Sequence, residues 1–227
     1  MDITLFYQEK GNKEPFILLH GNGENGTYFK HQMDYFSDRY RVIAIDTRGH
    51  GRSQRGTAPF TIEQFSCDLN DFMIDLGISS AIILGFSDGA NIAMKFAIKH
   101  PDKVKALILN GGNLNPRGVK RTVQIPIEIG YREARQFASK SPEANKKAEM
   151  LGLMVNDPNI EPSELSKITA PTLVICGTKD MIKESHTRLI CQSLPDAQLA
   201  LVEGDHFVAR RNSAEFNEVA AQFLAAK

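Results

Sequence analysis

Short apolar segments alternate with longer amphipathic segments along most of this 227-residue chain. Several of the apolar segments are rich in β-branched residues and apolar on both faces, which is typical of strands covered by helices on two sides. They span residues 16–19, 41–45, 81–84, 104–109, 172–176 and 198–202. Apolar side chains at helical spacing lie between or after them, in residues 61–76, 89–100, 181–194 and 214–225. This alternation predicts an α/β fold, a doubly wound and mostly parallel sheet.

Residues 113–167 interrupt the alternation. This segment contains five prolines and no run typical of a buried strand, and it has short helical pieces such as residues 132–138 and 142–153. We interpret it as a small helical cap inserted into a single domain that spans residues 1–227. Its apolar residues are candidates for lining an acyl pocket or for packing against the main domain. They are Ile125, Ile127, Ile129, Tyr131, Phe137, Leu151, Leu153 and Met154.

Composition excludes several classes of protein. The 27 basic and 27 acidic residues balance, so the chain lacks the net positive charge that nucleic-acid binding requires. No apolar run approaches the roughly 20 residues of a membrane span, and the first residues do not resemble a secretory signal. The three cysteines lack the spacing of a disulfide framework or a metal site, which predicts reduced thiols. We therefore expect a cytoplasmic protein without a nucleic-acid partner or a membrane span. We further expect a monomer or a homodimer.

The sharpest motif is Gly85-Phe86-Ser87-Asp88-Gly89, between a predicted strand and a predicted helix. A G-x-S-x-G pattern carries meaning only in this strand–turn–helix context. Small residues two positions before and after the serine relieve crowding on a sharp turn. A helix N-terminus also favours a developing negative charge. Ser87 is therefore the candidate nucleophile, the alternative being an ordinary glycine-rich turn with an exposed serine.

A serine nucleophile needs a base to accept its proton and an acid to orient that base. Asp180 follows the strand at residues 172–176, and His206 follows the strand at residues 198–202. Both positions are carboxyl ends of strands, where open α/β sheets place their ligand-binding groups. Asp205 is a rival acid, but next to His206 it would have difficulty reaching back to the inner ring nitrogen. The motifs therefore predict the order Ser87, Asp180, His206.

A tetrahedral oxyanion requires backbone N–H donors. The residue after the nucleophile, Asp88, is one candidate. The second is Asn22 in the glycine-rich segment His20-Gly21-Asn22-Gly23, which follows the first buried strand. A plain Asn-Gly turn is the alternative reading of that segment.

Together these segments resemble the α/β-hydrolase fold family, and in particular its small bacterial esterase-like members. The resemblance rests on Leu19–Gly23, Asp46–Ser53, Gly85–Gly89, Ile168–Asp180 and Gly204–Phe207, which occur in the family's order. It implies hydrolysis of a small to medium carboxylic ester, thioester or lactone through an acyl-enzyme, with Ser87, His206 and Asp180 as the triad. It implies no metal and no organic cofactor, and it places the cap at residues 113–167. Only residues 3–9 precede the first buried strand as a further strand, so the family's first strand is missing and we expect about seven strands.

Other reactions and substrates stay open. Dehalogenases and epoxide hydrolases of this fold use an aspartate nucleophile, so Ser87 argues against both. A C–C bond hydrolase or lyase would use the same triad, and a non-catalytic ligand receptor is a further alternative. Asp88 beside the nucleophile suggests a preference for substrates with an ammonium group, unless it only supports a polar helix start. Eight basic against three acidic residues between positions 117 and 147 suggest an anionic substrate, unless they form a solvated helix face.

Overall fold

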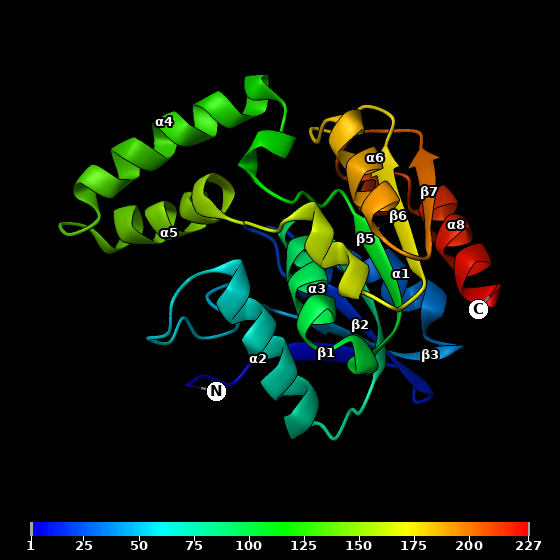
Figure 1. Ribbon diagram of the computed structural model, residues 1–227. Helices are drawn as coiled ribbons and strands as arrows, with labels where there is room; N and C mark the ends of the chain where they lie inside the picture. Colours follow the sequence, from blue (N-terminus) through cyan, green and yellow to red (C-terminus); the bar gives the residue numbers. More distant parts are fainter. Residues whose placement is uncertain (1, 227) are drawn as a thin grey trace.

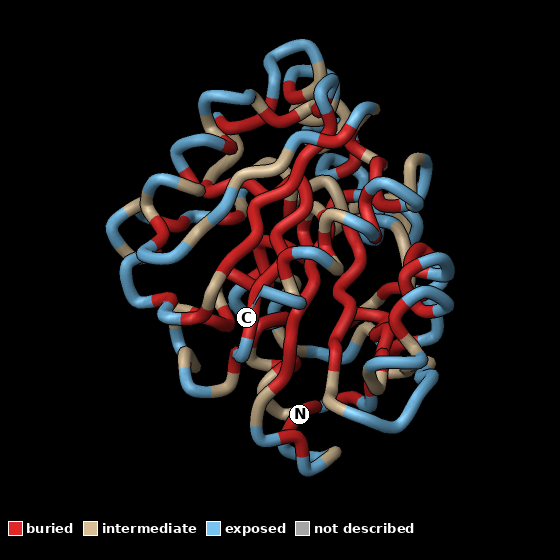
Figure 2. The backbone as a smooth tube through the Cα atoms, turned by 90° about the vertical axis from the view of Figure 1, so that its right-hand side faces the viewer, coloured by how far each residue is buried: buried red, intermediate tan, exposed pale blue. Residues whose placement is uncertain are grey.

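Seven strands form one sheet in the order β1-β3-β2-β4-β5-β6-β7, in a computed structural model that describes residues 2–226 (Figure 1). Strand β1 runs antiparallel to β3, and all other neighbours are parallel. The strands are β1 (Tyr7–Lys10), β2 (Glu14–Leu19), β3 (Tyr40–Ile45), β4 (Ala81–Phe86), β5 (Val104–Asn110), β6 (Thr172–Gly177) and β7 (Ala197–Val202). Figure 2 shows that the central strands are buried along most of their length, as their apolar composition predicts. The fold class and the strand number are confirmed.

Helices cover both faces of the sheet. Apolar side chains of α2, α3 and α6 pack on one face, and those of α1 and α8 pack on the other. The α-helices of this core are α1 (Lys30–Phe36), α2 (Ile62–Asp75), α3 (Asp88–Lys99), α6 (Glu184–Ser193), α7 (Val208–Arg211) and α8 (Ser213–Ala225). Short 3-10 helices are η1 (Gly26–Phe29), η2 (Pro101–Lys103), η3 (Pro116–Gly118) and η4 (Pro162–Lys167). Every described helix of residues 2–226 is too short or too polar to cross a bilayer.

Two helices between β5 and β6, α4 (Arg121–Phe137) and α5 (Pro142–Asn156), form a hairpin that projects from the sheet (Figure 1). The short helical piece predicted at residues 132–138 is the end of a longer helix, because α4 begins at Arg121 and contains Pro126. Thr122 and Pro126 are both exposed, so water can hydrate the carbonyl group that Pro126 leaves without a helical partner. The division into one domain with a cap at residues 113–167 stays a prediction.

The apolar residues of the hairpin do not share one role. Ile125, Ile129 and Phe137 are 40%, 51% and 55% exposed, so they do not line an enclosed acyl pocket, and for them that hypothesis is wrong. Leu153 is 1% exposed and belongs to the core between the sheet and α3. Only the side of the hairpin that faces the sheet is available to shape a substrate site.

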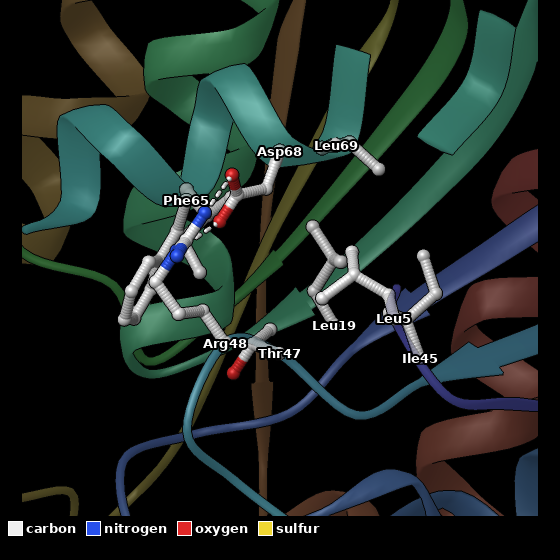
Figure 3. A pocket seen from close by; sticks show the side chains of 9 residues that line it. Leu5, Leu19, Ile45, Thr47, Arg48, Phe65, Asp68 and Leu69 are labelled. Atoms are coloured by element: carbon white, nitrogen blue, oxygen red, sulfur yellow. Dashed lines mark hydrogen bonds and ion pairs between the residues drawn. The ribbon is translucent and has the colours of Figure 1, made fainter. Parts of the chain in front are cut away.

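A buried ion pair links the loop after β3 to α2. Arg48 is 1% exposed and donates from Nε and Nη2 to the two carboxylate oxygens of Asp68, each at 2.7 Å. Its Nη2 also donates to Asp2 at 2.6 Å. Figure 3 shows this pair beside a void of about 10 Å³ whose other walls include the apolar side chains of Leu5 and Leu19. Because a bidentate pair fixes the guanidinium plane, it anchors the residues next to Arg48.

Candidate active site

The register of the parallel strands brings the predicted site residues to one edge of the sheet. Leu19 at the end of β2 pairs with Gly85 of β4, and Phe86 pairs with Asn110 of β5. Gly177 at the end of β6 pairs with Val202 of β7. The segments that follow these strand ends carry Asn22, Ser87, Asp180 and His206. Residues that are far apart in the sequence therefore meet at the carboxyl edge.

Ser87 lies at a strained turn. Its φ of 54° and ψ of −117° make it the one non-glycine residue with positive φ among residues 2–226. Its N–H donates to the carbonyl oxygen of Asn110 at 2.8 Å, which holds the turn. A Cβ atom on Gly89 would lie 1.9 Å from the carbonyl oxygen of Leu19, so the motif needs a glycine there. We call this turn around Ser87 the elbow. It has the strain that we predicted, and strain of this kind is commonly stored at functional sites.

His206 and Asp180 form a buried pair. Nδ1 of His206 lies 2.7 Å from Oδ1 of Asp180, and each residue is 4% exposed. The same oxygen accepts the N–H of Ile182 at 2.9 Å. Nε2 of His206 is buried and has no hydrogen-bond partner, so the bond to Ser87 is not made in this conformation. The free nitrogen is the one that a triad would turn toward the nucleophile.

Gly111 makes room for this pair and was not identified from the sequence. Its φ is +63°, and a Cβ atom there would lie 2.8 Å from Cε1 of His206. Any side chain would therefore displace the imidazole. The available signal was the pair Gly111-Gly112 directly after the strand at residues 104–109.

Asp205 faces away from the histidine beside it. Its carboxylate forms an ion pair with Arg211 and accepts the N–H of Phe207 at 2.9 Å. The structure therefore brings Asp180, and not the rival Asp205, onto His206.

His20 supports the glycine-rich loop, a role that sequence reasoning missed. Its Nε2 accepts the N–H of Thr47 at 3.0 Å, so Nδ1 carries the proton and donates to the carbonyl oxygen of Gly21 at 2.7 Å. Burial, and then the neighbouring His50, lower the pKa of His20 to about 3. The imidazole is therefore neutral and fixes the backbone just before Asn22. Its position next to the loop glycine was the only available signal.

The two candidate oxyanion donors are near the elbow and the hairpin. Within residues 2–226, neither the N–H of Asn22 nor that of Asp88 donates to a protein acceptor, so both are free for a ligand. The Asn22 side chain donates from Nδ2 to the carbonyl oxygen of Met150 in α5 at 2.6 Å. Arg55 and Glu149 form a bidentate ion pair nearby, with a shortest distance of 2.6 Å. Helix α5 is thus attached to the glycine-rich loop that carries Asn22 and to the loop after β3.

Asp88 is a buried carboxyl group beside the candidate nucleophile. Oδ1 accepts from Asn91 at 3.3 Å, whereas Oδ2 has no hydrogen-bond partner. Burial raises the pKa of Asp88 to about 6, and the negative charge of Asp157 adds to this shift. The contact with Asn91 agrees with a polar helix start, and the free oxygen leaves ammonium recognition as a prediction.

The raised pKa of Asp88 predicts a pH-dependent stability. Between pH 4 and 6 the unfolded chain has lost this proton while the folded chain keeps it, so the free energy of unfolding falls as the pH rises through about 6. A pKa that rises from 3.8 to about 6 corresponds to about 3 kcal/mol. We expect Asp88→Asn to gain about this much relative to the wild type at pH 8 compared with pH 4. Urea denaturation of both proteins at pH 4 and pH 8 measures this gain. The prediction is contradicted if the free energies of unfolding of the variant and the wild type differ by the same amount at both pH values.

Comparison with known proteins places the chain in a family. The alpha/beta hydrolase fold family matches residues 14–148, more than half of the sequence. The chain belongs to the α/β hydrolase fold family. Among residues 2–226, no group of three or more His, Cys, Asp or Glu side chains is arranged to hold a metal ion.

Curated relatives and solved structures of hydrolases are similar to the chain. Epoxide hydrolase 3 of Xenopus tropicalis is 37% identical over 47% of this chain, but the match covers only 30% of that relative. The putative carbamate hydrolase RutD of Azorhizobium caulinodans is 25% identical over 98% of this chain and 95% of its own length. The enol-lactonase structure from Burkholderia xenovorans LB400 has a TM-score of 0.83 at 22% identity and covers 98% of this chain and 97% of that one. The family and these relatives identify the chain as an enzyme of the α/β hydrolase superfamily.

Proposed function

We propose that this enzyme hydrolyses small to medium carboxylic esters, including thioesters or lactones, through an acyl-enzyme. The observation that carries the proposal is the buried 2.7 Å contact between His206 and Asp180 at the same sheet edge as the strained Ser87. An imidazole oriented by a carboxylate is the arrangement that activates a serine hydroxyl. In this proposal Ser87 is the nucleophile, His206 the base and Asp180 the orienting acid.

The proposed reaction has two stages. Oγ of Ser87 attacks the ester carbonyl carbon while Nε2 of His206 accepts the hydroxyl proton. The N–H groups of Asn22 and Asp88 donate to the oxyanion, and the departing alkoxide takes the proton from His206. Water then loses a proton to His206 and attacks the acyl carbon, which releases the acid and restores the serine. Because Nε2 of His206 has no partner in this conformation, a small rotation of Ser87 or a bound substrate must complete the arrangement.

The relatives favour an ester or a related acyl substrate. A lactone is a cyclic ester, and a carbamate is also cleaved at a carbonyl carbon, so the names enol-lactonase and putative carbamate hydrolase agree with acyl chemistry. The epoxide hydrolase match is less informative, because it covers 30% of that protein and Ser87 occupies the nucleophile position here.

Labelling and turnover test the proposal together. We expect a fluorophosphonate probe to label the wild type at Ser87, because a phosphonyl group captures an activated serine. A series of chromogenic acyl esters of increasing chain length should be hydrolysed with a clear length optimum, which measures the depth of the acyl pocket. Ser87→Ala should lose both labelling and turnover. Ser163→Ala, at an exposed serine of η4, is the matched control and should keep both.

Product analysis separates the remaining alternatives. Turnover of a diketone at Ser87 without turnover of any ester would replace ester hydrolysis with C–C bond hydrolysis. Ligand binding with no turnover by the wild type would instead support a receptor. Retention of ester turnover by Ser87→Ala would overturn the proposed nucleophile.

A further inference from the structure

The segment that leads into α4 pairs directly with the loop that carries Asp180. Lys120 donates its N–H to the carbonyl oxygen of Met181 at 2.9 Å, and Lys183 donates its N–H to the carbonyl oxygen of Gly118 at 2.9 Å. Val119 and Ile182 form the antiparallel bridge between these two bonds. We call residues 118–120 the cap stem and residues 180–183 the acid loop. In Figure 1 the cap stem passes beside the segment before α6.

The pairing is continuous with the carboxylate of Asp180. Ile182, the residue bridged to Val119, donates its own N–H to Oδ1 of Asp180 at 2.9 Å. That oxygen is also the one 2.7 Å from Nδ1 of His206. Val119 and Ile182 are 4% and 2% exposed, so water does not compete for the bridge. A shift of the cap stem would therefore move a hydrogen-bond donor of the candidate triad acid.

Lys120 adds a second contact to the same residue. Its Nζ donates to the backbone carbonyl oxygen of Asp180 at 2.5 Å. Lys120 also lines a hollow of about 390 Å³, whose walls include Cys176, Asp180 and Leu201. The attraction between the ammonium charge and the carbonyl dipole stabilises the contact. Lys120 stands at the start of α4 and thus joins the hairpin to the acid loop.

We infer that the cap stem positions the triad acid and that Lys120 is a positioning residue for Asp180. A movement of the α4–α5 hairpin then changes the orientation of the His206–Asp180 pair as well as access to the site. This inference rests on the proposed function for its kinetic consequence, but the His206–Asp180 contact can be observed without turnover. No substrate contact is assigned to Lys120.

Two lysine variants provide a matched test. Lys120→Met removes the contact with Asp180, whereas Lys13→Met removes a bond of the same kind outside the site, from Nζ to the backbone carbonyl oxygen of Asp38 at 2.7 Å. We expect Lys120→Met to lower kcat for the best ester about tenfold with little change in KM, the size of one lost charged hydrogen bond. Lys13→Met should stay close to the wild type. Lys120→Arg, which keeps a cationic donor, should recover most of the loss.

Proton NMR tests the contact itself. A proton on Nδ1 of His206 bonded to a carboxylate gives a far-downfield resonance, whose position reports the geometry of that bond. We expect this resonance to shift or broaden in Lys120→Met and to remain in Lys13→Met. Thermal unfolding of both variants checks that the fold is retained.

The outcomes separate the two proposals. A wild type with neither labelling nor turnover would overturn the proposed function, and the inference would then be decided by the NMR comparison alone. An active wild type with the same kcat and the same resonance in Lys120→Met would overturn the inference. Equal losses in Lys120→Met and Lys13→Met would also overturn it, because they would show only a general effect of removing a lysine contact.

Discussion

An Asp180→Asn substitution is expected to lower kcat for ester hydrolysis by about 10⁴-fold. The amide has nearly the shape of the carboxylate, so the fold should survive, although an NH₂ group in place of Oδ1 gives up the bond from the N–H of Ile182. An NH₂ group facing Nδ1 of His206, however, favours the tautomer that carries its proton on Nε2. That nitrogen then cannot accept the proton of Ser87. Steady-state kinetics with the best chromogenic ester, together with a thermal unfolding curve, measures the effect.

Asp205→Asn is the matched control, because it makes the same chemical change one residue away from His206. Asp205 contacts Arg211 and the N–H of Phe207. We expect its kcat to remain within a few-fold of the wild type, since losing an exposed ion pair affects stability by only about 0–1 kcal/mol. A loss of activity in Asp205→Asn with an active Asp180→Asn would reverse the assignment of the acid.

An Asp68→Ala substitution is expected to lower the free energy of unfolding by about 3–5 kcal/mol. The change leaves the guanidinium of Arg48 buried at 1% exposure, with only the Asp2 carboxylate and one backbone carbonyl as partners. Arg48 follows Thr47, whose N–H holds His20 and through it the glycine-rich loop that carries Asn22. We therefore expect a lower free energy of unfolding under all conditions. Turnover should fall only under conditions close to the unfolding midpoint. Urea denaturation at pH 7 measures it.

A surface pair of the same length is the control. Lys10 and Asp34 are also 2.7 Å apart, but their side chains are 53% and 57% exposed. We expect Asp34→Ala to cost less than about 1 kcal/mol, because water screens the pair and solvates the remaining lysine. Similar losses in the two variants would contradict the importance of burial.

The sequence was sufficient to predict the core of the fold. The run Phe16–Leu19 is apolar on both faces and is buried completely in β2, and the other five runs also became parallel strands. Strands covered on both sides have no polar face, so composition alone identifies them. Helix boundaries were less accessible. The helix expected at residue 181 begins at Glu184, because Met181 and Ile182 pair with the cap stem.

The site was predictable where the signal is local. The elbow around Ser87 is a local feature, because the glycines that relieve its crowding lie two residues away on each side. Gly111 and His20 act on residues that are close only in space, and no pattern within the sequence assigned them a role.

The sequence by itself determined the alternation of strands and helices, the strained elbow at Ser87 and the presence of an acid and a histidine after later strands, because these depend on neighbours within a few residues. The tertiary structure decided that Asp180 rather than Asp205 contacts His206, that Asp88 is buried with a raised pKa, and that the cap stem holds the acid loop. These features depend on strand register and on the exclusion of water by segments far apart in the chain. Neither quantity is encoded in local periodicity.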